Sequence, residues 1–374
     1  MRAPSPSGGW GSSPRKARSV TAVPEAAPRT VPAGTLIDAA TRILRRVGVP
    51  DAGAARVARN LVTADLRGVE THGLIRLSAY VQRIEAGGIA ADPTIEIVRD
   101  HPATALLDGG NGLGAVGASA AMDLAMDKAA ACGVGLVVVR DINHFGAAAD
   151  YSMTAAERGM IGLAATNVLA LIAPTGASVP MVGNNPLSFA FPGDPPVVYD
   201  SAMSVSTWGR VLVAAQRGEP LPEGAFLDGD GRPTTDPAAV LGGGTLLPVA
   251  GYKGYGLALC VSLLTGVLGG WLSDAELTGH RPDEPGGNTA VLGAIDVAAF
   301  TDPAEFARRA DRIGAEIRTA PRRPGVDRVW LPGEKEAERE RERRAGGVPL
   351  AEAVRADLAA LAARLGVELG AELR

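Results

Sequence analysis

Two short segments of this sequence combine residue types that can bind an anion and transfer a proton. In the first, "THGLIRLSAY", His72, Arg76 and Tyr80 recur at steps of four after Thr71. On a helix this spacing places the three side chains on one stripe. An arginine there can bind a carboxylate through charge-assisted hydrogen bonds, each worth about 1.5–3 kcal/mol. The same spacing is common by chance, and taken alone it favours a solvated helix face.

The second segment, "VVVRDINHFGAAADY", places His144 between an apolar run that predicts a strand and an alanine-rich run that predicts a helix. In α/β folds, such junctions are where ligands meet the chain. A positioned histidine that transfers a proton contributes about 10²–10⁴ in rate. A histidine hydrogen-bonded within the loop fits the same place equally well, so these residues leave both interpretations open.

A lysine between glycines, Lys253 in "GYKGYG", stands at the expected start of an apolar helix. Free backbone N–H groups, the helix dipole and an ammonium group together suit a phosphate. The segment is not a Walker motif. A flexible start of the helix with a solvated lysine is an equal alternative.

A second glycine motif has the spacing of a dinucleotide-binding loop. Gly112, Gly114 and Gly117 follow a short strand and precede a helix, with Asp141 at the end of the next strand. Regular βαβ units do not follow, because the strands after residue 161 come in quick succession without helices between them. This favours a fold other than the Rossmann fold.

Other classes of function are disfavoured by composition. His72, His101, His144 and His280 show no ligand-like spacing with Cys, Asp or Glu, so no metal site is expected. The chain contains no G-x-S-x-G, so a serine hydrolase is not indicated. The net charge is −4, and no basic run is interleaved with aromatic residues, so no nucleic-acid partner is expected.

Cysteine usage and hydropathy predict a cytoplasmic protein without a membrane segment. Cys132 and Cys260 lie far apart in apolar surroundings and are expected to be reduced core residues. The longest apolar run, residues 256–271, is shorter than the roughly 20 residues of a membrane span and is broken by glycines. It therefore predicts a buried helix.

The 374 residues are enough to bury a large core, and the patterns divide them into regions. Residues 1–33 are rich in Pro, Ser, Gly and Arg and lack the apolar stretch of a secretory signal, which predicts a disordered tail. Residues 34–92 show helical spacing of apolar residues. Residues 93–299 alternate strand-like and helix-like pieces, and residues 300–374 are expected to complete the helical domain.

The sheet-containing region has recognisable strands and one long connection. The expected strands are "TALLD", "VGLVVVRD", "MIGLAATN", "LSFAFPG" and "VVYDSA". Residues 218–244, rich in Pro, Gly and Asp, predict an exposed loop. Near the C-terminus, "GEKEAERERERRAGG" predicts a solvated charged helix, and "PLAEAVRADLAALAARLG" predicts an amphipathic helix that starts at Pro349.

Taken together, these segments resemble the malate/L-lactate dehydrogenases of the sulfolactate-dehydrogenase type. Relatives of that group include ureidoglycolate dehydrogenase, diketogulonate reductase and piperideine-2-carboxylate reductase. The resemblance runs from about Thr35 to the C-terminus. It rests on several long motifs in the right order: "ADLRGVETHGLIRLSAYVQRI", "INHFGAAADY", "GNNPLSFAFPG", "PTTDP", "LLPVAGYKGYGLAL" and "VWLPGEKE".

The resemblance implies an oxidoreductase that uses NAD or NADP to interconvert a 2-oxo acid and a 2-hydroxy acid. It implies an α/β (α+β) fold of non-Rossmann type, in which a mixed, largely antiparallel sheet is flanked by helices. It also implies a homodimer that completes the active site. Residues 34–92 then form the substrate side, residues 93–299 the cofactor-binding domain, and Gly112 a structural turn.

The resemblance further assigns roles to individual residues. His144 of "NHFG" is expected to be the catalytic acid/base, while Thr71, His72 and Arg76 are expected to bind the substrate. The residues expected to bind the cofactor are Asp200, Ser201, Ala202, Lys253, Gly254, Gly333, Glu334 and Lys335.

Two departures from the family pattern bear on activity. Val168 follows Asn167 where relatives carry a serine that contacts the cofactor, so that hydroxyl contact is lost. Relatives usually have a Gly-His pair entering the late strand that ends in "AID". This chain has Thr289 and Ala290 there, after a shortened loop, so its substrate range or activity could differ.

Two alternatives to a 2-oxo acid reductase stay open. An NADPH-dependent reductase of a cyclic imino acid needs the same carboxylate-binding residues and the same hydride donor. A catalytically idle dimeric homologue is the other alternative. The presence of His72, Arg76, His144 and Lys253 argues against an idle homologue.

Overall fold

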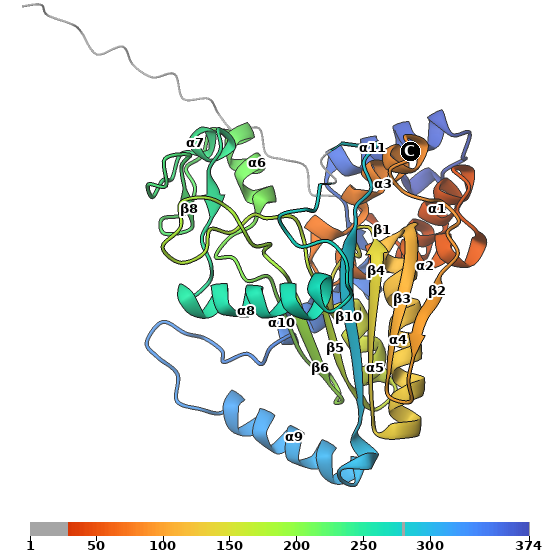
Figure 1. Cartoon of the computed structure of the whole chain (residues 1–374), viewed down its shortest axis with the longest axis vertical. Coiled ribbons are helices and arrows are strands. Elements are labelled where there is room, and N and C mark those ends of the chain that lie inside the picture. The colour runs from red at the N-terminus through yellow and green to blue at the C-terminus, as the bar shows by residue number, and fades with distance from the viewer. Residues whose placement is uncertain (1–28, 279–280, 374) are drawn as a thin grey trace, which may run out of the picture.

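A seven-stranded sheet forms the centre of the computed structural model, which describes residues 29–278 and 281–373 (Figure 1). The strand order is β2-β3-β4-β10-β5-β6-β7. The β3–β4 pair is parallel, and the other neighbouring pairs of this sheet are antiparallel. The strands are β2 (Glu96–Asp100), β3 (Thr104–Gly112), β4 (Val134–Ile142), β5 (Met160–Thr166), β6 (Leu187–Phe191), β7 (Val197–Ser201) and β10 (Asn288–Asp296). The mixed, largely antiparallel, non-Rossmann sheet expected from the sequence is confirmed.

Helices cover both faces of the central strands, which explains the continuous apolar runs in those strands. Val137 and Val139 of β4 pack against α4 (Gly114–Cys132) and α5 (Ala149–Glu157). Val138 points to the other face and packs with Val261 of α8 (Tyr252–Ser262). The alternation follows from the two-residue period of a strand.

A separate helical core lies at one end of the sheet. It is built from α1 (Ala33–Arg46), α2 (Asp51–Leu66), α3 (Leu77–Glu85) and α11 (Glu352–Arg364), followed by η5 (Ala371–Leu373). Chain segments from both ends of the sequence therefore share one core. The apolar face expected on the last helix is confirmed, because Leu358 and Leu361 are buried in it. That helix begins at Glu352, not at Pro349.

The N-terminal boundary differs from the prediction of a tail over residues 1–33. Residues 1–28 lie outside the described residues. Beyond them, β1 (Thr30–Val31) pairs with β11 (Val348–Pro349) in an antiparallel bridge. Val31 and Val348 are fully buried, so apolar packing orders this part of the expected tail.

The prediction of an exposed loop at residues 218–244 is also wrong. It follows α6 (Trp208–Arg217) and contains β8 (Phe226–Leu227) and α7 (Pro237–Leu241), and β8 pairs with β9 (Thr245–Leu246). Phe226 and Val240 are fully buried in a small apolar core. The scattered large apolar residues of the segment thus outweigh its Pro, Gly and Asp content.

The apolar run at residues 256–271 is not the buried helix that its composition predicts. It forms α8 and a π-helical turn, η3 (Leu263–Val267). One side packs on the sheet, and the other side is exposed, Cys260 included. Cys132 at the end of α4 is likewise free and exposed, so the expectation of core cysteines is wrong. No helix among the described residues is long and apolar enough to cross a membrane.

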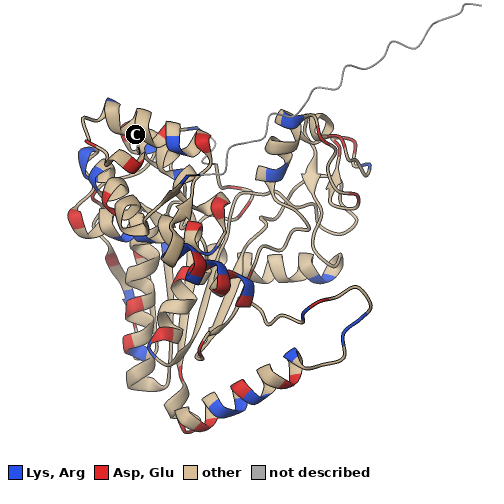
Figure 2. Ribbon diagram, turned by 180° about the vertical axis from the view of Figure 1, so that it is seen from behind, with Lys and Arg blue, Asp and Glu red and all other residues tan. Residues whose placement is uncertain are grey.

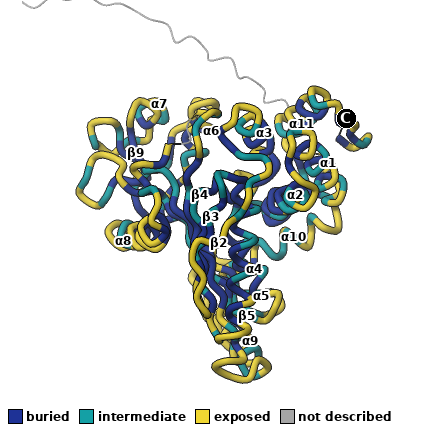
Figure 3. The backbone as a smooth tube through the Cα atoms, turned by 45° about the vertical axis from the view of Figure 1, so that its right-hand side comes forward, coloured by how far each residue is buried: buried dark blue, intermediate teal, exposed yellow. Residues whose placement is uncertain are grey.

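The region between β10 and α11 runs from the far end of the sheet back to the helical core (Figure 1). After η4 (Val297–Ala299), α9 (Pro303–Arg318) lies at the far end of the sheet and is mostly exposed (Figure 3). The charged helix α10 (Glu334–Gly346) then returns to α2. It is not fully solvated, because Glu334 is buried and Glu340 pairs with the buried Arg67 at 2.9 Å. Figure 2 shows basic and acidic residues interspersed over the surface.

Candidate active site

The segment that carries the predicted substrate residues is not one continuous helix. It forms two short 3₁₀ turns, η1 (Glu70–His72) and η2 (Leu74–Arg76), before α3 begins. The break is built around Asp65, whose Oδ2 accepts the backbone N–H of Leu74 at 2.9 Å. A Cβ on Gly73 would lie 1.8 Å from Oδ1 of the same carboxyl group. The carboxyl group of Asp65 therefore packs into the break between the two turns, with His72 in one turn and Arg76 in the other.

The predicted catalytic and substrate residues nevertheless come together. The rings of His72 and His144 stack with their centroids 5.4 Å apart. The hydroxyl of Thr71 lies 3.0 Å from Nδ1 of His72, and Nε of Arg76 donates to the carbonyl of Thr71 at 2.7 Å. The positive charge of Arg76 acts on both imidazoles. Two segments about 70 positions apart in the sequence thus form one cluster.

Tyr80 also belongs to this cluster, although the sequence analysis assigned it no role. Its Oη lies 2.6 Å from Nδ1 of His144. The only signal in the sequence was its spacing of four from Arg76. Arg83, one further turn along α3, was missed as well. Its charge acts on His144, and its guanidinium donates to the carbonyl of Glu284 at 2.6 Å.

The cluster holds uncharged imidazoles next to arginine charges. Burial lowers the pKa of His144 well below its usual value, and the neighbouring His72 and the charges of Arg76 and Arg83 lower it further. Burial, followed by the charge of Arg76, lowers the pKa of His72 to about 4. Burial raises the pKa of Tyr80, so its phenol stays protonated. At neutral pH the site therefore presents positive arginine charge and neutral acid/base groups, a combination suited to an anion.

Asp200, Ser201 and Ala202 lie at and just beyond the end of β7. The backbone N–H of Ala149, at the start of α5, donates to Oδ2 of Asp200 at 3.0 Å. Desolvation of the carboxyl group by the surrounding protein raises the pKa of Asp200 to about 6. The hydroxyl of Ser201 donates to the carbonyl of Ala202 at 2.9 Å. The contact between Ala149 and Asp200 places this segment beside α5, the helix that follows the His144 loop.

Gly333, Glu334 and Lys335 form the start of α10, where the chain approaches Val198 of β7. Gly333 has φ +80°, and a Cβ there would lie 2.7 Å from Cβ of Val198. Glu334 is buried, and its carboxylate accepts the N–H of Leu331 at 3.0 Å. Arg318 and Arg328 also pair with it, at 2.8 and 3.0 Å. The carboxylate of Glu334 therefore holds the turn, whereas Lys335 is exposed, with its Nζ 5.5 Å from the centroid of the Trp330 ring.

Lys253 and Gly254 form the first turn of α8. A Cβ on Gly254 would lie 2.1 Å from the carbonyl oxygen of Val249, so no larger residue fits. Val249 in turn donates its N–H to Met203 at 2.9 Å, next to the Asp200–Ala202 segment. In the described part of the chain, Lys253 makes no ion pair and no side-chain hydrogen bond, and it is exposed. Neither kind of contact joins it to the His144 cluster there.

The two departures from the family pattern meet in the structure. The N–H of Thr289 donates to Oδ1 of Asn167 at 2.8 Å, and the N–H of Asn167 donates to the carbonyl of Thr289 at 3.1 Å. The N–H of Val168 donates to Oδ1 of Asn185 at 3.0 Å. The Thr289 hydroxyl is buried and has no hydrogen-bond partner among the described residues. Both departures therefore alter one small region between β5 and β10.

Comparison with known proteins identifies the class. The family model for malate/L-lactate dehydrogenase matches residues 31–359. The chain is 39% identical over 349 residues to malate dehydrogenase of Pyrococcus horikoshii, covering 90% of this chain and 96% of that protein. It is 37% identical over 329 residues to L-sulfolactate dehydrogenase of Methanothermobacter thermautotrophicus, covering 87% and 94%.

Solved structures agree with this comparison. The structure of malate dehydrogenase from Pyrococcus horikoshii superposes with a TM-score of 0.86 at 35% identity, covering 92% of this chain and 98% of that one. Piperideine-2-carboxylate reductase from Pseudomonas syringae superposes with a TM-score of 0.81 at 30% identity, covering 89% and 99%. The chain belongs to the malate/L-lactate dehydrogenase family and is an oxidoreductase of that family.

Proposed function

We propose that this protein interconverts a 2-oxo acid and a 2-hydroxy acid by hydride transfer, with NAD or NADP as the cofactor. The observation that carries the proposal is the meeting of His144 with His72 and Arg76 in one cluster. It unites an acid/base group with a cation that binds carboxylates. The malate and sulfolactate dehydrogenases similar to this chain act, by their names, on acids of this type.

In this proposal the substrate carboxylate binds to Arg76. The Nε of Arg76 already donates to the carbonyl of Thr71, which fixes the guanidinium and leaves both Nη groups for a bidentate contact. The neutral imidazole of His72 and the hydroxyl of Thr71 add hydrogen bonds to the same anion. The negative charge of the bound substrate offsets the positive charge of Arg76. Binding therefore raises the pKa of His144 toward its usual value.

His144 moves the proton. A bound nicotinamide supplies or accepts the hydride. In the oxidation direction, Nε2 of neutral His144 accepts the proton of the substrate hydroxyl. This requires the tautomer in which the Nδ1–H of His144 donates to Oη of Tyr80, 2.6 Å away. In the reduction direction, the imidazolium keeps that contact and gives the Nε2 proton to the oxygen of the substrate carbonyl.

The residues expected to bind the cofactor fit such a group. A dinucleotide needs cations and close backbone approach at its phosphates. Lys253 is exposed at the first turn of α8, whose first N–H groups have no partner within the helix. Gly254 and Gly333 pack against Val249 and Val198 of the same chain, which fixes the two turns that carry Lys253 and Lys335. We assign the phosphates to Lys253 and Gly254, and the rest of the cofactor to Asp200–Ala202 and Gly333–Lys335.

We also propose a cytoplasmic homodimer. A second copy would cover the exposed apolar side of α8 and η3. Exposed apolar patches of this kind mark protein–protein contacts, because their contact with water is unfavourable. Its residues are Leu257, Leu259, Leu263, Leu264, Val267 and Leu268. Light scattering coupled to gel filtration tests this assignment. A dimer is expected for the wild type and a monomer for a Leu264→Glu variant, whereas a monomeric wild type would contradict the proposal.

A substrate panel tests the proposed function. Oxidation of NADH and of NADPH is followed with oxaloacetate, pyruvate, sulfopyruvate and piperideine-2-carboxylate. Turnover of a 2-oxo acid that is lost in His144→Ala, with cofactor binding retained, is the expected result. Exclusive turnover of the cyclic imine would favour the second candidate, which the structural similarity to piperideine-2-carboxylate reductase supports. Binding of NADH and NADPH is measured separately by fluorescence titration. No fluorescence change with either cofactor would indicate an idle homologue.

A further inference from the structure

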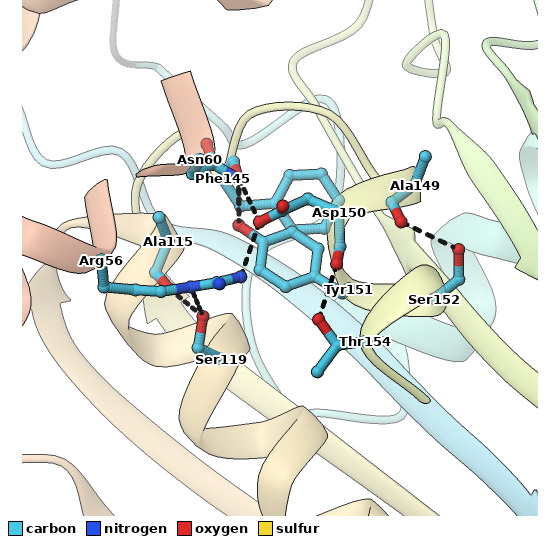
Figure 4. Close-up of polar contacts among 10 residues, drawn as sticks. All are labelled: Arg56, Asn60, Ala115, Ser119, Phe145, Ala149, Asp150, Tyr151, Ser152 and Thr154. Atoms are coloured by element: carbon cyan, nitrogen blue, oxygen red, sulfur yellow. Dashed lines mark hydrogen bonds and ion pairs between the residues drawn. The ribbon is translucent and has the colours of Figure 1, made fainter. Parts of the chain in front are cut away.

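A largely buried polar network contacts the backbone that follows His144, at Phe145 and Gly146. It joins Arg56 and Asn60 of α2 to Asp150 and Tyr151 of α5 (Figure 4). The proposed reaction assigns none of these residues a task. We propose that Tyr151 is a positioning residue for His144 and that the other three side chains hold Tyr151 in place. This inference rests on the proposed function, because it gives His144 the proton-transfer role.

The first step concerns the backbone next to His144. The hydroxyl of Tyr151, which is fully buried, donates to the carbonyl of Phe145, the residue that follows His144. The rings of Phe145 and Tyr151 also stack, with centroids 5.0 Å apart. Burial raises the pKa of Tyr151 well above its usual value, so its hydroxyl keeps its proton and remains a donor. One peptide bond thus separates the proposed catalytic histidine from a buried anchor.

The second step concerns Asn60, which is 1% exposed. Its Nδ2 donates to Oδ2 of Asp150 at 2.9 Å and lies 3.4 Å from the hydroxyl of Tyr151. Its Oδ1 would lie 2.1 Å from a Cβ on Gly146, which has φ +83°. The backbone two residues after His144 is therefore pressed directly against α2. A glycine at residue 146 is required by both its conformation and this approach.

The third step concerns the charge that completes the network. Arg56 donates to Oδ2 of Asp150 at 2.6 Å and to the hydroxyl of Ser119 on α4 at 2.5 Å. The side chains of Arg56 and Asp150 are 23% and 12% exposed, so solvent screens this pair only in part. Asp150 accepts from both Arg56 and Asn60, and it thereby fixes the two groups next to Tyr151.

The network sets the distance between two halves of the site. The helical core carries Arg76 and His72, and it also carries Asn60 on α2. The sheet-containing part carries the loop of His144. Contacts on both sides of that loop, Tyr80 with the imidazole and Asn60 with the backbone, come from the helical core. A shift of the loop by about 1 Å can cost about 10²-fold in rate, so its anchoring bears directly on turnover.

The test compares two variants of α5 that each lose one buried hydroxyl. Tyr151→Phe removes the donor to Phe145. Ser152→Ala is the matched control, because Ser152 is equally buried but pairs with Ser188, 2.7 Å away, and not with the His144 loop. We expect kcat of Tyr151→Phe to fall about tenfold or more, while the dissociation constant of NADH changes less than twofold. Ser152→Ala should keep the wild-type kcat.

A spectroscopic readout makes the test independent of turnover. The chain has four histidines, so their ring signals in ¹H–¹⁵N NMR spectra can be assigned by substitution. Tyr151→Phe should move the His144 ring signals and leave those of the exposed His101 unchanged. Arg56→Gln, at the more accessible end of the network, should give the same changes at smaller size and serves if Tyr151→Phe does not fold.

The outcomes separate this inference from the proposed function. A wild type that turns over no substrate of the panel contradicts the proposed function, and the NMR comparison then still decides whether Tyr151 positions His144. An active wild type with an equally active Tyr151→Phe variant overturns the inference alone. The same holds if Tyr151→Phe and Ser152→Ala lose equal thermal stability and the His144 signals stay in place. In that case the network is a stabilising part of the core only.

Discussion

Replacing Tyr80 by phenylalanine is the change that most cleanly separates orientation of His144 from binding at the site. It removes one hydroxyl, whose oxygen lies 2.6 Å from Nδ1 of His144, and it keeps the buried ring that packs in the helical core. Without Oη, the Nδ1–H tautomer loses its partner in a half-buried site. The other tautomer, in which Nε2 carries the proton and cannot accept one from the substrate, is then no longer disfavoured.

The expected size follows from the hydrogen bond that is lost. A buried donor left without its partner costs about 1–3 kcal/mol. If that cost falls on the state in which His144 is correctly oriented, kcat decreases by a factor of about 5 to 150, since about 1.4 kcal/mol corresponds to a factor of ten. The affinity for the cofactor should stay the same, because no assigned cofactor residue contacts Tyr80.

Steady-state kinetics in the oxidation direction provides the assay, with a fluorescence titration of NADH as the binding control. Tyr255→Phe on α8 serves as a matched control, since it removes a tyrosine hydroxyl that makes no described contact with the cluster. A kcat for Tyr80→Phe within twofold of the wild type would refute the role of Tyr80 as the partner of Nδ1. A loss of NADH affinity equal to the loss of kcat would do so as well.

Three other changes probe charge and burial at the site. Arg76→Lys keeps the charge but loses the planar fork, so kcat/KM for the 2-oxo acid should fall about 10- to 150-fold, mainly through KM; an unchanged KM would place the carboxylate elsewhere. Arg83→Gln removes a charge that lowers the pKa of His144, so the acid limb of kcat/KM for oxidation should move to higher pH, and an unmoved limb counts against this coupling. Burial raises the pKa of Asp65 to about 7, whereas its pKa in the unfolded chain is near 3.8. The free energy of unfolding therefore declines as the pH rises between these two values. Asp65→Asn keeps an acceptor for Leu74 and should raise stability at pH 8 by on the order of 3 kcal/mol more than at pH 4; equal melting-temperature gains at both values would show that the carboxyl charge is not the cause.

The central sheet and the helical core could be anticipated because both follow periodic rules. Runs such as "VGLVVVRD" bury both faces of a strand, and the spacing of Leu358 and Leu361 buries one face of a helix. Those signals are local to each segment. They predict an element well and leave its partners open.

The errors arose where distant residues decide the local structure. The helix after Thr71 is broken because the carboxyl group of Asp65 takes the N–H of Leu74, and no pattern within residues 71–88 reveals this. The segment 218–244 has the composition of a loop, yet Phe226 and Val240 close a small core of its own. An apolar run such as residues 256–271 predicts burial, but it does not say which of its sides packs on the sheet and which stays exposed.

The site shows the same division. Residue types marked His144 and Arg76 as candidates, and the motifs shared with the family assigned their roles. The contacts of Tyr80 and Tyr151 could not be predicted from the sequence. Both residues contact the His144 loop from elements whose packing depends on the whole fold. The role expected for Glu334 at the cofactor stays a prediction. The structure adds a contact set that the sequence could not reveal, in which its carboxylate pairs with Leu331, Arg318 and Arg328.

A crystal structure of the protein with NADH and oxamate, an unreactive 2-oxo acid analogue, tests the convergence of His144 and Arg76 most directly. The predicted result is an oxamate carboxylate bound by both Nη groups of Arg76, with its carbonyl oxygen within about 3.2 Å of Nε2 of His144. The nicotinamide ring should lie against the same carbonyl carbon. An oxamate bound away from Arg76, or a His144 ring that does not face it in the ternary complex, would contradict the proposed chemistry.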